Sequence, residues 1–296
     1  MSNILIKQFY KQRKDFEDSC AERDLRLTFP EGVICSTDIA YSDDGNKAHR
    51  LDIYRPEDSQ EKNLPVIINV HGGGLIIGNK EFNRYFCALL CKKGFLVYSI
   101  EYRLIPDCLM YDQISDVFKA MDYIKERLAA DGGDLSHVYM AGDSGGACLI
   151  TYANAIQNST NIARAANVTP SGLRINALGL ISGMFYTSRL DKIGLFLPKY
   201  LYGRDYKKTS FAKYVNPENR ELLNSLAPVW LVTSHNDFLR RYTTDFEKAL
   251  TRAEREHELV AFPKNKKLTH AFSVFEPFLS ESSEVIDMMV EYFRKF

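Results

Sequence analysis

The chain has 296 residues, of which 45% are hydrophobic, and its 38 lysines and arginines balance 38 aspartates and glutamates. This apolar content excludes wholesale disorder, and the zero net charge argues against a nucleic-acid binder, which needs a clustered excess of basic residues. The length fits two domains or one large α/β domain.

The first thirty residues are predicted to form a charged amphipathic helix, with Ile4, Leu5, Phe9 and Phe16 at its apolar positions. This region has no apolar stretch long enough for a signal peptide, and the chain has no run of about 18 apolar residues. From the sequence we therefore expect no membrane span.

The six cysteines are spread along the chain rather than gathered into a small framework. Cys87 and Cys91 are four residues apart on a predicted helix, a spacing that a metal site can use. No second cysteine or histidine pair with zinc-like spacing accompanies them, so we interpret them as core thiols. We expect a soluble, metal-free protein of a reducing cytoplasm.

Residues 33–41 and 50–54 are predicted to pair as an antiparallel hairpin around a turn at 42–46. Beyond it, short apolar runs alternate with helical patterns, such as the apolar side chains spaced three and four apart between Ile114 and Ile124. The runs have the nearly continuous hydrophobicity of strands that are covered on both faces. The predicted strands are 65–70, 95–100, 138–141, 177–181, 229–233 and 258–262, and further helices are predicted at 147–157, 243–256 and 282–295.

This alternation predicts a doubly wound, mostly parallel α/β sheet with an antiparallel start. Two stretches fit it poorly, the N-terminal helix and residues 184–222, which are rich in aromatic and leucine side chains but weak in strand character. We interpret both as a cap over the carboxyl edge of the sheet, where ligands bind in open α/β folds. An ordinary helical excursion is the alternative.

The sharpest motif is Gly-Asp-Ser-Gly-Gly at residues 142–146, between a predicted strand and a predicted helix. A serine in this context lies on a strained turn that needs small neighbours and presents its hydroxyl outward. The turn also points Ser144 at a helix N-terminus, where backbone N–H groups stabilise negative charge. The motif therefore predicts a nucleophile at Ser144, and a tightly packed glycine-rich turn is the alternative.

A second motif, His-Gly-Gly-Gly at residues 71–74, directly follows the predicted strand 65–70. Glycines let the backbone approach a ligand and turn its N–H groups into a site. Together with the amide of Gly145, the amides of Gly73 and Gly74 would form an oxyanion hole. We expect His71 to orient the loop by hydrogen bonds. A phosphate-binding loop fits poorly, because no Gly-Lys-Ser/Thr follows.

These motifs, together with Glu-Tyr-Arg-Leu-Ile-Pro at residues 101–106, resemble the hormone-sensitive-lipase-like esterases of the α/β-hydrolase fold. Asp237, which follows the strand 229–233, resembles the acid of that family, and His270 in Thr-His-Ala-Phe resembles its histidine. The resemblance implies a mostly parallel central sheet flanked by helices, with a helical cap. It divides the chain into an N-terminal cap segment with the start of the sheet (1–45) and an α/β-hydrolase core (46–296) with a cap insertion near 184–222.

Some positions depart from the usual motifs of the family. After the serine, Gly145 stands where the family usually has alanine. In the motif at 101–106 and just after it, Ile105 and Asp107 replace alanine and glutamate. Phe238 follows the acid, where the family usually has a small residue and Pro-Leu nearby. None of these departures removes a catalytic group, so they bear on acyl and alcohol specificity rather than on the reaction.

The order Ser144, Asp237, His270 along the chain is that of an α/β-hydrolase triad. Ser144 would attack an acyl carbon, His270 would take its proton and pass it to the leaving group, and Asp237 would orient the imidazole. All three lie just past predicted strands, so they can converge at one edge of the sheet.

Other residues are weaker candidates for the acid and the base, because they do not follow strands in the same way. The acids are Asp191 and Asp245; of the histidines, His49 and His257 are expected at the surface and His137 in a structural role beside a strand, while His235 lies close enough to Asp237 to line the site.

The leading hypothesis is a cofactor-free serine hydrolase, similar to a carboxylesterase or acetylesterase, that cleaves short- to medium-chain carboxylic esters through an acyl-enzyme. The same chemistry serves an amidase, an arylformamidase or a peptidase. A non-catalytic small-molecule receptor is the third alternative, and His270 argues against it, because such receptors typically lack that histidine. The expected partner is a small acyl ester, with no nucleic acid, and the resemblance allows a homodimer.

Overall fold

The computed structural model of the chain describes residues 3–58 and 63–296. Eight strands of this part form its centre: β1 (Val33–Ala40), β2 (Arg50–Pro56), β3 (Leu64–Val70), β4 (Leu96–Ile100), β5 (Gly133–Asp143), β6 (Ala177–Ile181), β7 (Val229–Ser234) and β8 (His257–Phe262). They make one sheet in the order β1-β2-β4-β3-β5-β6-β7-β8. β2 is antiparallel to both its neighbours, and every other adjacent pair is parallel. The α/β-hydrolase architecture predicted from the sequence is confirmed.

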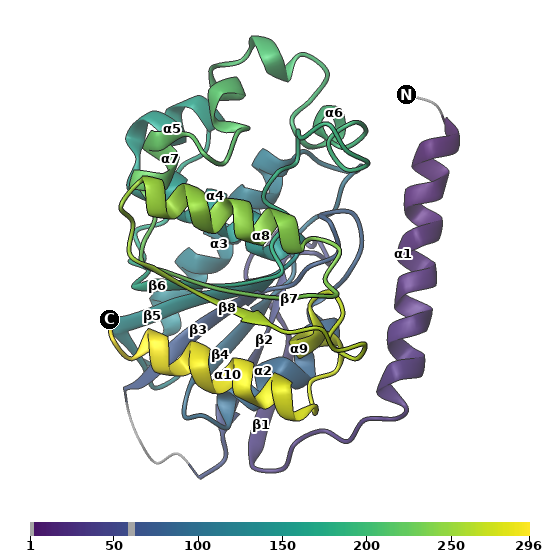
Figure 1. Cartoon of the computed structure of the whole chain (residues 1–296). Coiled ribbons are helices and arrows are strands. Elements are labelled where there is room, and N and C mark those ends of the chain that lie inside the picture. Colours follow the sequence, from purple (N-terminus) through teal and green to yellow (C-terminus); the bar gives the residue numbers. More distant parts are fainter. Residues whose placement is uncertain (1–2, 59–62) are drawn as a thin grey trace.

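Helices cover both faces of the sheet (Figure 1). One face carries α3 (Met110–Arg127), α4 (Gly145–Asn158) and α8 (Arg240–Arg252), and the other carries α2 (Arg84–Cys91) and α10 (Ser280–Phe293). Side chains alternate along a strand, so Val66 and Ile68 of β3 pack into the first layer while Ile67 packs into the second, and all three are fully buried. This two-sided burial is why the central strands are apolar without interruption.

Strand and helix boundaries differ from the predictions where the sequence is polar. β5 begins at Gly133 rather than at residue 138, because Asp134, Ser136 and His137 interrupt the apolar pattern without ending the strand. α8 and α10 begin at Arg240 and Ser280, before the first apolar residues that marked them in the sequence. The strand 177–181 coincides with β6.

Helix α1 (Asn3–Asp24) stands along one side of the molecule (Figure 1). It is shorter than the predicted helix of thirty residues, because Pro30 and Gly32 disfavour helical backbone before β1. The ring of Phe16 packs edge-on against that of Phe82, with 4.8 Å between the ring centroids. The ring of Phe9 packs in the same way against that of Tyr200, with 5.3 Å between the centroids. The side chains of Ile4 and Leu5, predicted as apolar positions, lie outside the described residues.

The segment 184–222 contains only short helices in the described structure. They are α6 (Pro198–Leu201), two 3₁₀ turns at Tyr206–Lys208 and Ser210–Tyr214, and α7 (Arg220–Asn224). Several of its aromatic side chains pack inward, such as Phe211 and Tyr214, which are almost fully buried, whereas Phe196 is exposed. This segment and α1 are the parts of the chain that were predicted as a cap. The remaining short helices are α5 (Thr160–Ala166), α9 (Phe272–Phe275) and a 3₁₀ turn at Lys80–Asn83.

Candidate active site

Ser144 lies on the turn between β5 and α4, with a positive φ of 50°. This strained conformation is rare for a side-chain-bearing residue and concentrates at functional sites. Close packing around the turn enforces it: a Cβ at Gly146 would come within 2.1 Å of the Val70 carbonyl oxygen, and one at Gly142 within 2.9 Å of Gly146. The turn therefore requires glycine at both flanks, as the motif predicted.

Asp237 and His270 come together from the ends of β7 and β8. The His270 Nδ1 lies 2.7 Å from Asp237 Oδ1, which also accepts a hydrogen bond from the Leu239 amide at 2.8 Å. The hydroxyl of Thr233 donates to the other carboxylate oxygen at 2.9 Å. Burial would raise the pKa of Asp237, but hydrogen bonds and the charge of His270 outweigh it and hold the pKa below its ordinary value. The carboxylate is thus ionised and fixed in direction.

Ser182 is a further contact of this pair, and sequence reasoning missed it. It directly follows β6 and has a positive φ of 51°. Its hydroxyl oxygen accepts a hydrogen bond from the amide of Ala271, the residue after His270, at 3.1 Å. It also contributes to the lowered pKa of Asp237. Ser182 and Thr233 carry no motif that marks them, because their role exists only once β6, β7 and the histidine loop are adjacent.

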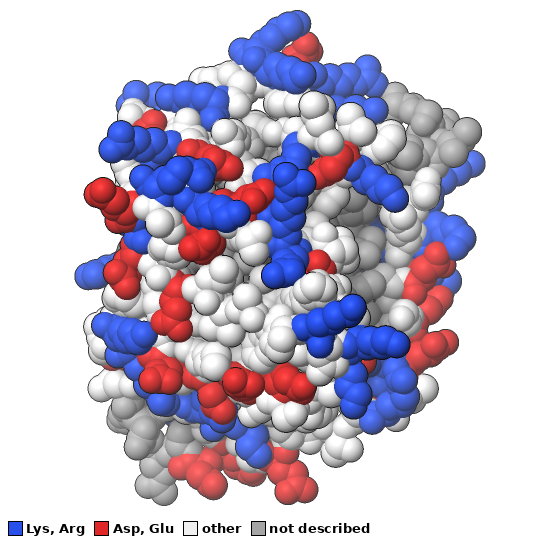
Figure 2. Space-filling model, in the orientation of Figure 1, with Lys and Arg blue, Asp and Glu red and all other residues white. Residues whose placement is uncertain are grey.

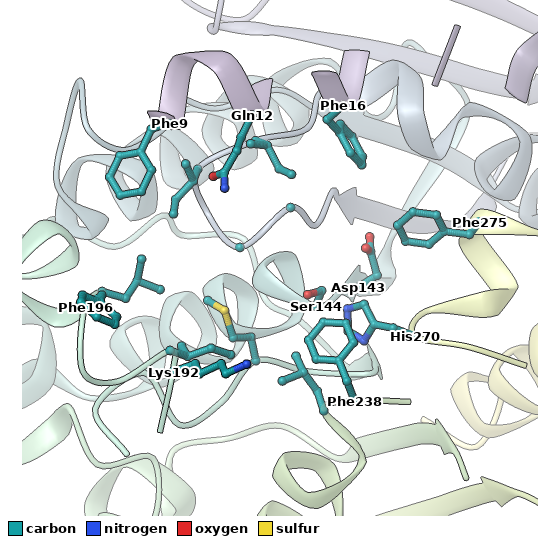
Figure 3. Close-up of a pocket in the computed structure, with 18 residues that line it drawn as sticks. Phe9, Gln12, Phe16, Asp143, Ser144, Lys192, Phe196, Phe238, His270 and Phe275 are labelled. Atoms are coloured by element: carbon teal, nitrogen blue, oxygen red, sulfur yellow. The ribbon is translucent and has the colours of Figure 1, made fainter. Parts of the chain in front are cut away.

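Ser144 and His270 line one cavity of about 590 Å³. In Figure 3 the Ser144 side chain lies beside the His270 ring at the floor of the cavity. Asp237 lies behind His270 and is not part of the lining. The structure thus brings the three predicted triad residues together in the order hydroxyl, imidazole, carboxylate.

The glycine loop 71–74 lies beside the serine turn. Gly73 and Gly74 line the cavity and have φ values of 99° and 63°. A Cβ at Gly145 would lie 2.8 Å from the Leu75 nitrogen and 2.9 Å from the Gly74 nitrogen, so the loop packs directly on the turn after Ser144. Within the described part of the chain, no group accepts a hydrogen bond from the Gly73 or Gly74 amide. These amides are available to a ligand oxygen next to Ser144.

His71 is fully buried beneath this loop and does not line the cavity. Its Nδ1 lies 2.9 Å from the Gly72 carbonyl oxygen, and its Nε2 lies 2.9 Å from Glu101 Oε1. Its ring stacks on Tyr102 at 4.4 Å. Burial would lower the pKa of His71, but the Glu101 carboxylate outweighs it and the pKa is raised. The protonated ring can therefore donate from both nitrogens and tie the loop to β4.

Asp143 also holds the glycine loop, a role that the sequence left open. Its Oδ1 accepts hydrogen bonds from the Gly72 amide at 3.0 Å and from Asn83 Nδ2 at 2.9 Å. Burial raises the pKa of Asp143 against the opposing effect of these donors. Asn83, which lies in the 3₁₀ turn before α2, was not singled out in the sequence.

The weaker candidates lie elsewhere. His49 is buried, not at the surface, because its ring fits between Asp44 and Asp116 at 2.6 and 3.0 Å. His235 is exposed beside Arg240 and does not line the cavity. The two acids have partners outside the site, since Asp191 accepts a hydrogen bond from Tyr242 and Asp245 pairs with Arg189. His137 pairs with Asp134, and His257 is largely buried at the start of β8.

The walls of the cavity are mostly apolar. α1 contributes Phe9 and Phe16, and the segment 184–222 contributes Ile193 and Phe196. Ile76 and Ile77 line it as well, whereas Leu75 is buried in the core. Phe238, which follows the acid, is 73% exposed and stacks near His270 at 4.3 Å between ring centroids.

Metal-binding side chains do not cluster in the described part of the chain. That part contains no group of three or more histidine, cysteine or acidic side chains that could hold a metal ion. Cys87 and Cys91 are both buried and unpaired. Figure 2 shows positive and negative side chains interspersed over one face. No helix among residues 3–58 and 63–296 is long and apolar enough to cross a membrane.

Comparison with known proteins gives matches of two kinds. A family profile of the alpha/beta hydrolase fold matches residues 67–273. A probable isoprenylcysteine alpha-carbonyl methylesterase of Oryza sativa subsp. japonica is 30% identical over 186 residues, which is 59% of this chain and 44% of that protein. A tuliposide A-converting enzyme of Tulipa gesneriana is 30% identical over 131 residues, 40% of this chain and 35% of that protein. The chain thus spans less than half the length of these relatives.

Among solved structures, esterase B from Lactobacillus rhamnosis is similar with a TM-score of 0.92 and 22% identity, over 99% of this chain and 95% of that one. A hyperthermophilic esterase from the archaeon Pyrobaculum calidifontis has a TM-score of 0.73 at 21% identity, over 100% and 98% of the two chains. At these identities the likeness establishes the fold.

Proposed function

The chain belongs to the hormone-sensitive-lipase-like family of the α/β-hydrolase fold, and we propose that it is a serine hydrolase that cleaves short- to medium-chain carboxylic esters through an acyl-enzyme. The observation that carries the proposal is the row Ser144, His270, Asp237 beside a loop with free amides. The similarity to a probable isoprenylcysteine alpha-carbonyl methylesterase supports the proposal, because the name of that relative describes cleavage of an ester.

In the first half-reaction, Ser144 Oγ attacks the acyl carbon while His270 Nε2 takes the hydroxyl proton. Asp237 holds Nδ1, so the free nitrogen faces the serine, and its charge stabilises the imidazolium that forms. The Gly73, Gly74 and Gly145 amides donate to the oxyanion of the tetrahedral intermediate. Loss of one such donor typically costs about 10²–10³ in kcat.

The intermediate collapses when His270 gives its proton to the leaving alcohol, which leaves an acyl group on Ser144. A water molecule then reaches the acyl carbon by the same route, with His270 again as base, and releases the acid. His71 acts from behind the site, since it holds the glycine loop and does not line the cavity, whereas Asp143 holds the same loop from the cavity lining. His71 is thus a positioning residue.

The cap segments, α1 and 184–222, are proposed to set which esters fit. Their side chains Phe9, Phe16, Ile193 and Phe196 give the cavity apolar walls that suit an aliphatic or aryl acyl group. In this proposal the substrate is selected by four side chains from two distant parts of the sequence, and neither part contains a triad residue.

The compartment is proposed to be a reducing one, the cytoplasm. All six cysteines are free, and burial raises the pKa of Cys91 and of Cys148 to about 12, which keeps both thiols protonated. Protein purified without reductant and then denatured should show six thiols per chain by Ellman titration. A disulfide in that sample would contradict this assignment.

The test of function is hydrolysis of p-nitrophenyl acetate, butyrate and octanoate by the wild type beside Ser144→Ala. We expect turnover that Ser144→Ala lowers by at least about 10⁴-fold, because triad members act as a unit, and labelling of the wild type alone by a fluorophosphonate probe. Faster cleavage of the matching nitroanilides than of the esters would make the protein an amidase. A folded wild type without turnover or label would exclude a serine hydrolase.

A further inference from the structure

Lys192 is unusual in the cavity that holds Ser144. It carries the only lysine or arginine side chain on the described lining, among walls that are mostly phenylalanine, isoleucine, leucine and methionine. The two other ionisable groups there have partners, since Asp143 accepts from Gly72 and Asn83 and His270 bonds Asp237. Lys192 is the ionisable group of the lining for which no partner has yet been named.

Over residues 3–58 and 63–296, no carboxylate lies within 4.0 Å of the Lys192 ammonium, and no group accepts a hydrogen bond from it. Asp191, the residue before Lys192, accepts from the Tyr242 hydroxyl at 2.6 Å, and Asp245 of α8 pairs with Arg189 at 2.9 Å. The fold therefore leaves this cation without an internal counter-ion.

The backbone that carries Lys192 is held in place. Asp191 Oδ1 accepts hydrogen bonds from the amides of Ile193 and Gly194 at 3.0 and 3.1 Å, and its other oxygen is bound by Tyr242 on α8. The segment is thus tied to α8 through Asp191, the residue before the lysine, and the turn that follows is closed on the same carboxylate. Figure 3 shows the Lys192 side chain extending from this segment toward the space beside Phe238.

We infer that Lys192 selects esters that carry a carboxylate on an otherwise apolar chain. The inference rests on the proposed esterase function and names its substrate class. Lys192 is exposed at this cavity, so a carboxylate that pairs with it gains a modest, salt-sensitive attraction that adds to the apolar contacts of the rest of the ester. The apolar walls would hold the aliphatic or aryl part of the same molecule. A purely apolar ester would fill the cavity and leave the ammonium unpaired.

The experiment compares anionic and neutral esters of equal length. On the acyl side these are the mono-4-nitrophenyl esters of adipic and suberic acid beside 4-nitrophenyl hexanoate and octanoate. On the alcohol side they are 4-acetoxybenzoate and its methyl ester. The readout is the ratio of kcat/KM for the anionic ester to that for its neutral partner, because the ratio cancels any general effect of a variant on the site.

We expect Lys192→Met to lower this ratio about fivefold in at least one set, as for a partly exposed ion pair, and Lys192→Glu to lower it further. High salt should lower the wild-type ratio as well. The matched control is Lys199→Met, since Lys199 lies in the same segment, packs on Tyr200 and lies outside this cavity. Its ratio should equal that of the wild type.

Ratios that stay unchanged in Lys192→Met and Lys192→Glu for both sets would overturn the inference, and so would an equal fall in Lys199→Met. These outcomes leave the esterase function standing as long as neutral esters are cleaved in a Ser144-dependent way. Absence of neutral ester cleavage would instead overturn the proposed function itself.

Discussion

The Nδ1 atom of His270 lies 2.7 Å from Oδ1 of Asp237, a carboxylate that also accepts hydrogen bonds from the Thr233 hydroxyl and the Leu239 amide. These donors leave Asp237 one orientation. A carboxylate fixed at Nδ1 favours the tautomer that carries its proton there, which leaves Nε2 as the nitrogen that can serve Ser144. The proposed mechanism makes the reactivity of Ser144 depend on this pair.

Replacing the acid tests that dependence. Asp237→Asn keeps the shape of the side chain but can present an amide N–H to Nδ1, which favours the wrong tautomer. We expect kcat for p-nitrophenyl butyrate to fall by about 10³–10⁴ with little change in KM. The pKa of Asp237 is lowered, so the wild-type carboxylate stays charged down to below about pH 4. A kcat within tenfold of the wild type would show that another group orients His270.

The loop-positioning pair His71 and Glu101 predicts a dependence of stability on pH. The pKa of His71 is raised in the folded state, so the pair contributes fully below the unfolded value of about 6.5 and is lost as the pH rises through the raised value. Glu101→Gln should therefore destabilise the protein by about 1.5–3 kcal/mol at pH 5.5, and by less as the pH increases.

Thermal unfolding of the wild type and Glu101→Gln between pH 5.5 and 9 measures this difference. The exposed Glu57→Gln is the matched control and should follow the wild type at every pH. A destabilisation by Glu101→Gln that grows with pH would contradict a charged His71.

Gly73 and Gly74 are predicted to differ sharply, although both have positive φ. A Cβ at Gly73 would lie 2.0 Å from the Ile77 carbonyl oxygen, whereas one at Gly74 meets nothing within 4 Å. Gly73→Ala must move the loop and should cost about 10²–10³ in kcat. Gly74→Ala carries only backbone strain of about 1–3 kcal/mol in stability and should keep most of the activity. Kinetics on p-nitrophenyl butyrate with melting temperatures separates the two, and an effect of Gly73→Ala on KM alone would count against the oxyanion role.

The anchor of α1 is a further target. Arg13 donates to the carbonyl oxygens of Ile76 and Ile105 at 2.8 and 2.6 Å and pairs with Asp107 at 2.7 Å. We expect Arg13→Ala to destabilise the protein by about 1.5–3 kcal/mol and to raise KM for p-nitrophenyl octanoate more than that for acetate, because Phe9 and Phe16 lose their place. Lys14→Ala removes only an exposed ion pair with Asp18 and should change neither the stability nor the two KM values. Equal KM values for both variants would mean that α1 is held by other contacts.

Much of this arrangement could be predicted from sequence because the informative residues lie next to each other in the chain. Ser144 is marked by its glycines, and Asp237 and His270 each follow a run of buried strand residues. The near-continuous hydrophobicity of 65–70 and 229–233 predicted parallel strands for the same local reason. Local pattern also explains the errors, since the polar start of β5 and the first turns of α8 and α10 show no apolar period.

The residues that sequence reasoning missed act across the fold. Glu101 reaches His71 because β4 lies next to β3, and Asn83 reaches Asp143 from the turn before α2. His49 was expected at the surface because its partner Asp116, on α3, is 67 positions away in sequence. Ser182 contacts the histidine loop only through the order of β6, β7 and β8. None of these pairs leaves a periodic or spacing signal.

Part of the cavity wall comes from α1, a helix that lies on neither face of the sheet and carries none of the reacting groups. Substitutions at Phe9, Gln12 or Phe16 are therefore predicted to change the cavity wall without replacing a reacting group. We propose that substrate choice is set in part by segments of the chain that carry none of the triad residues. A library confined to the cavity-facing positions of this one helix would be the economical route to altered selectivity.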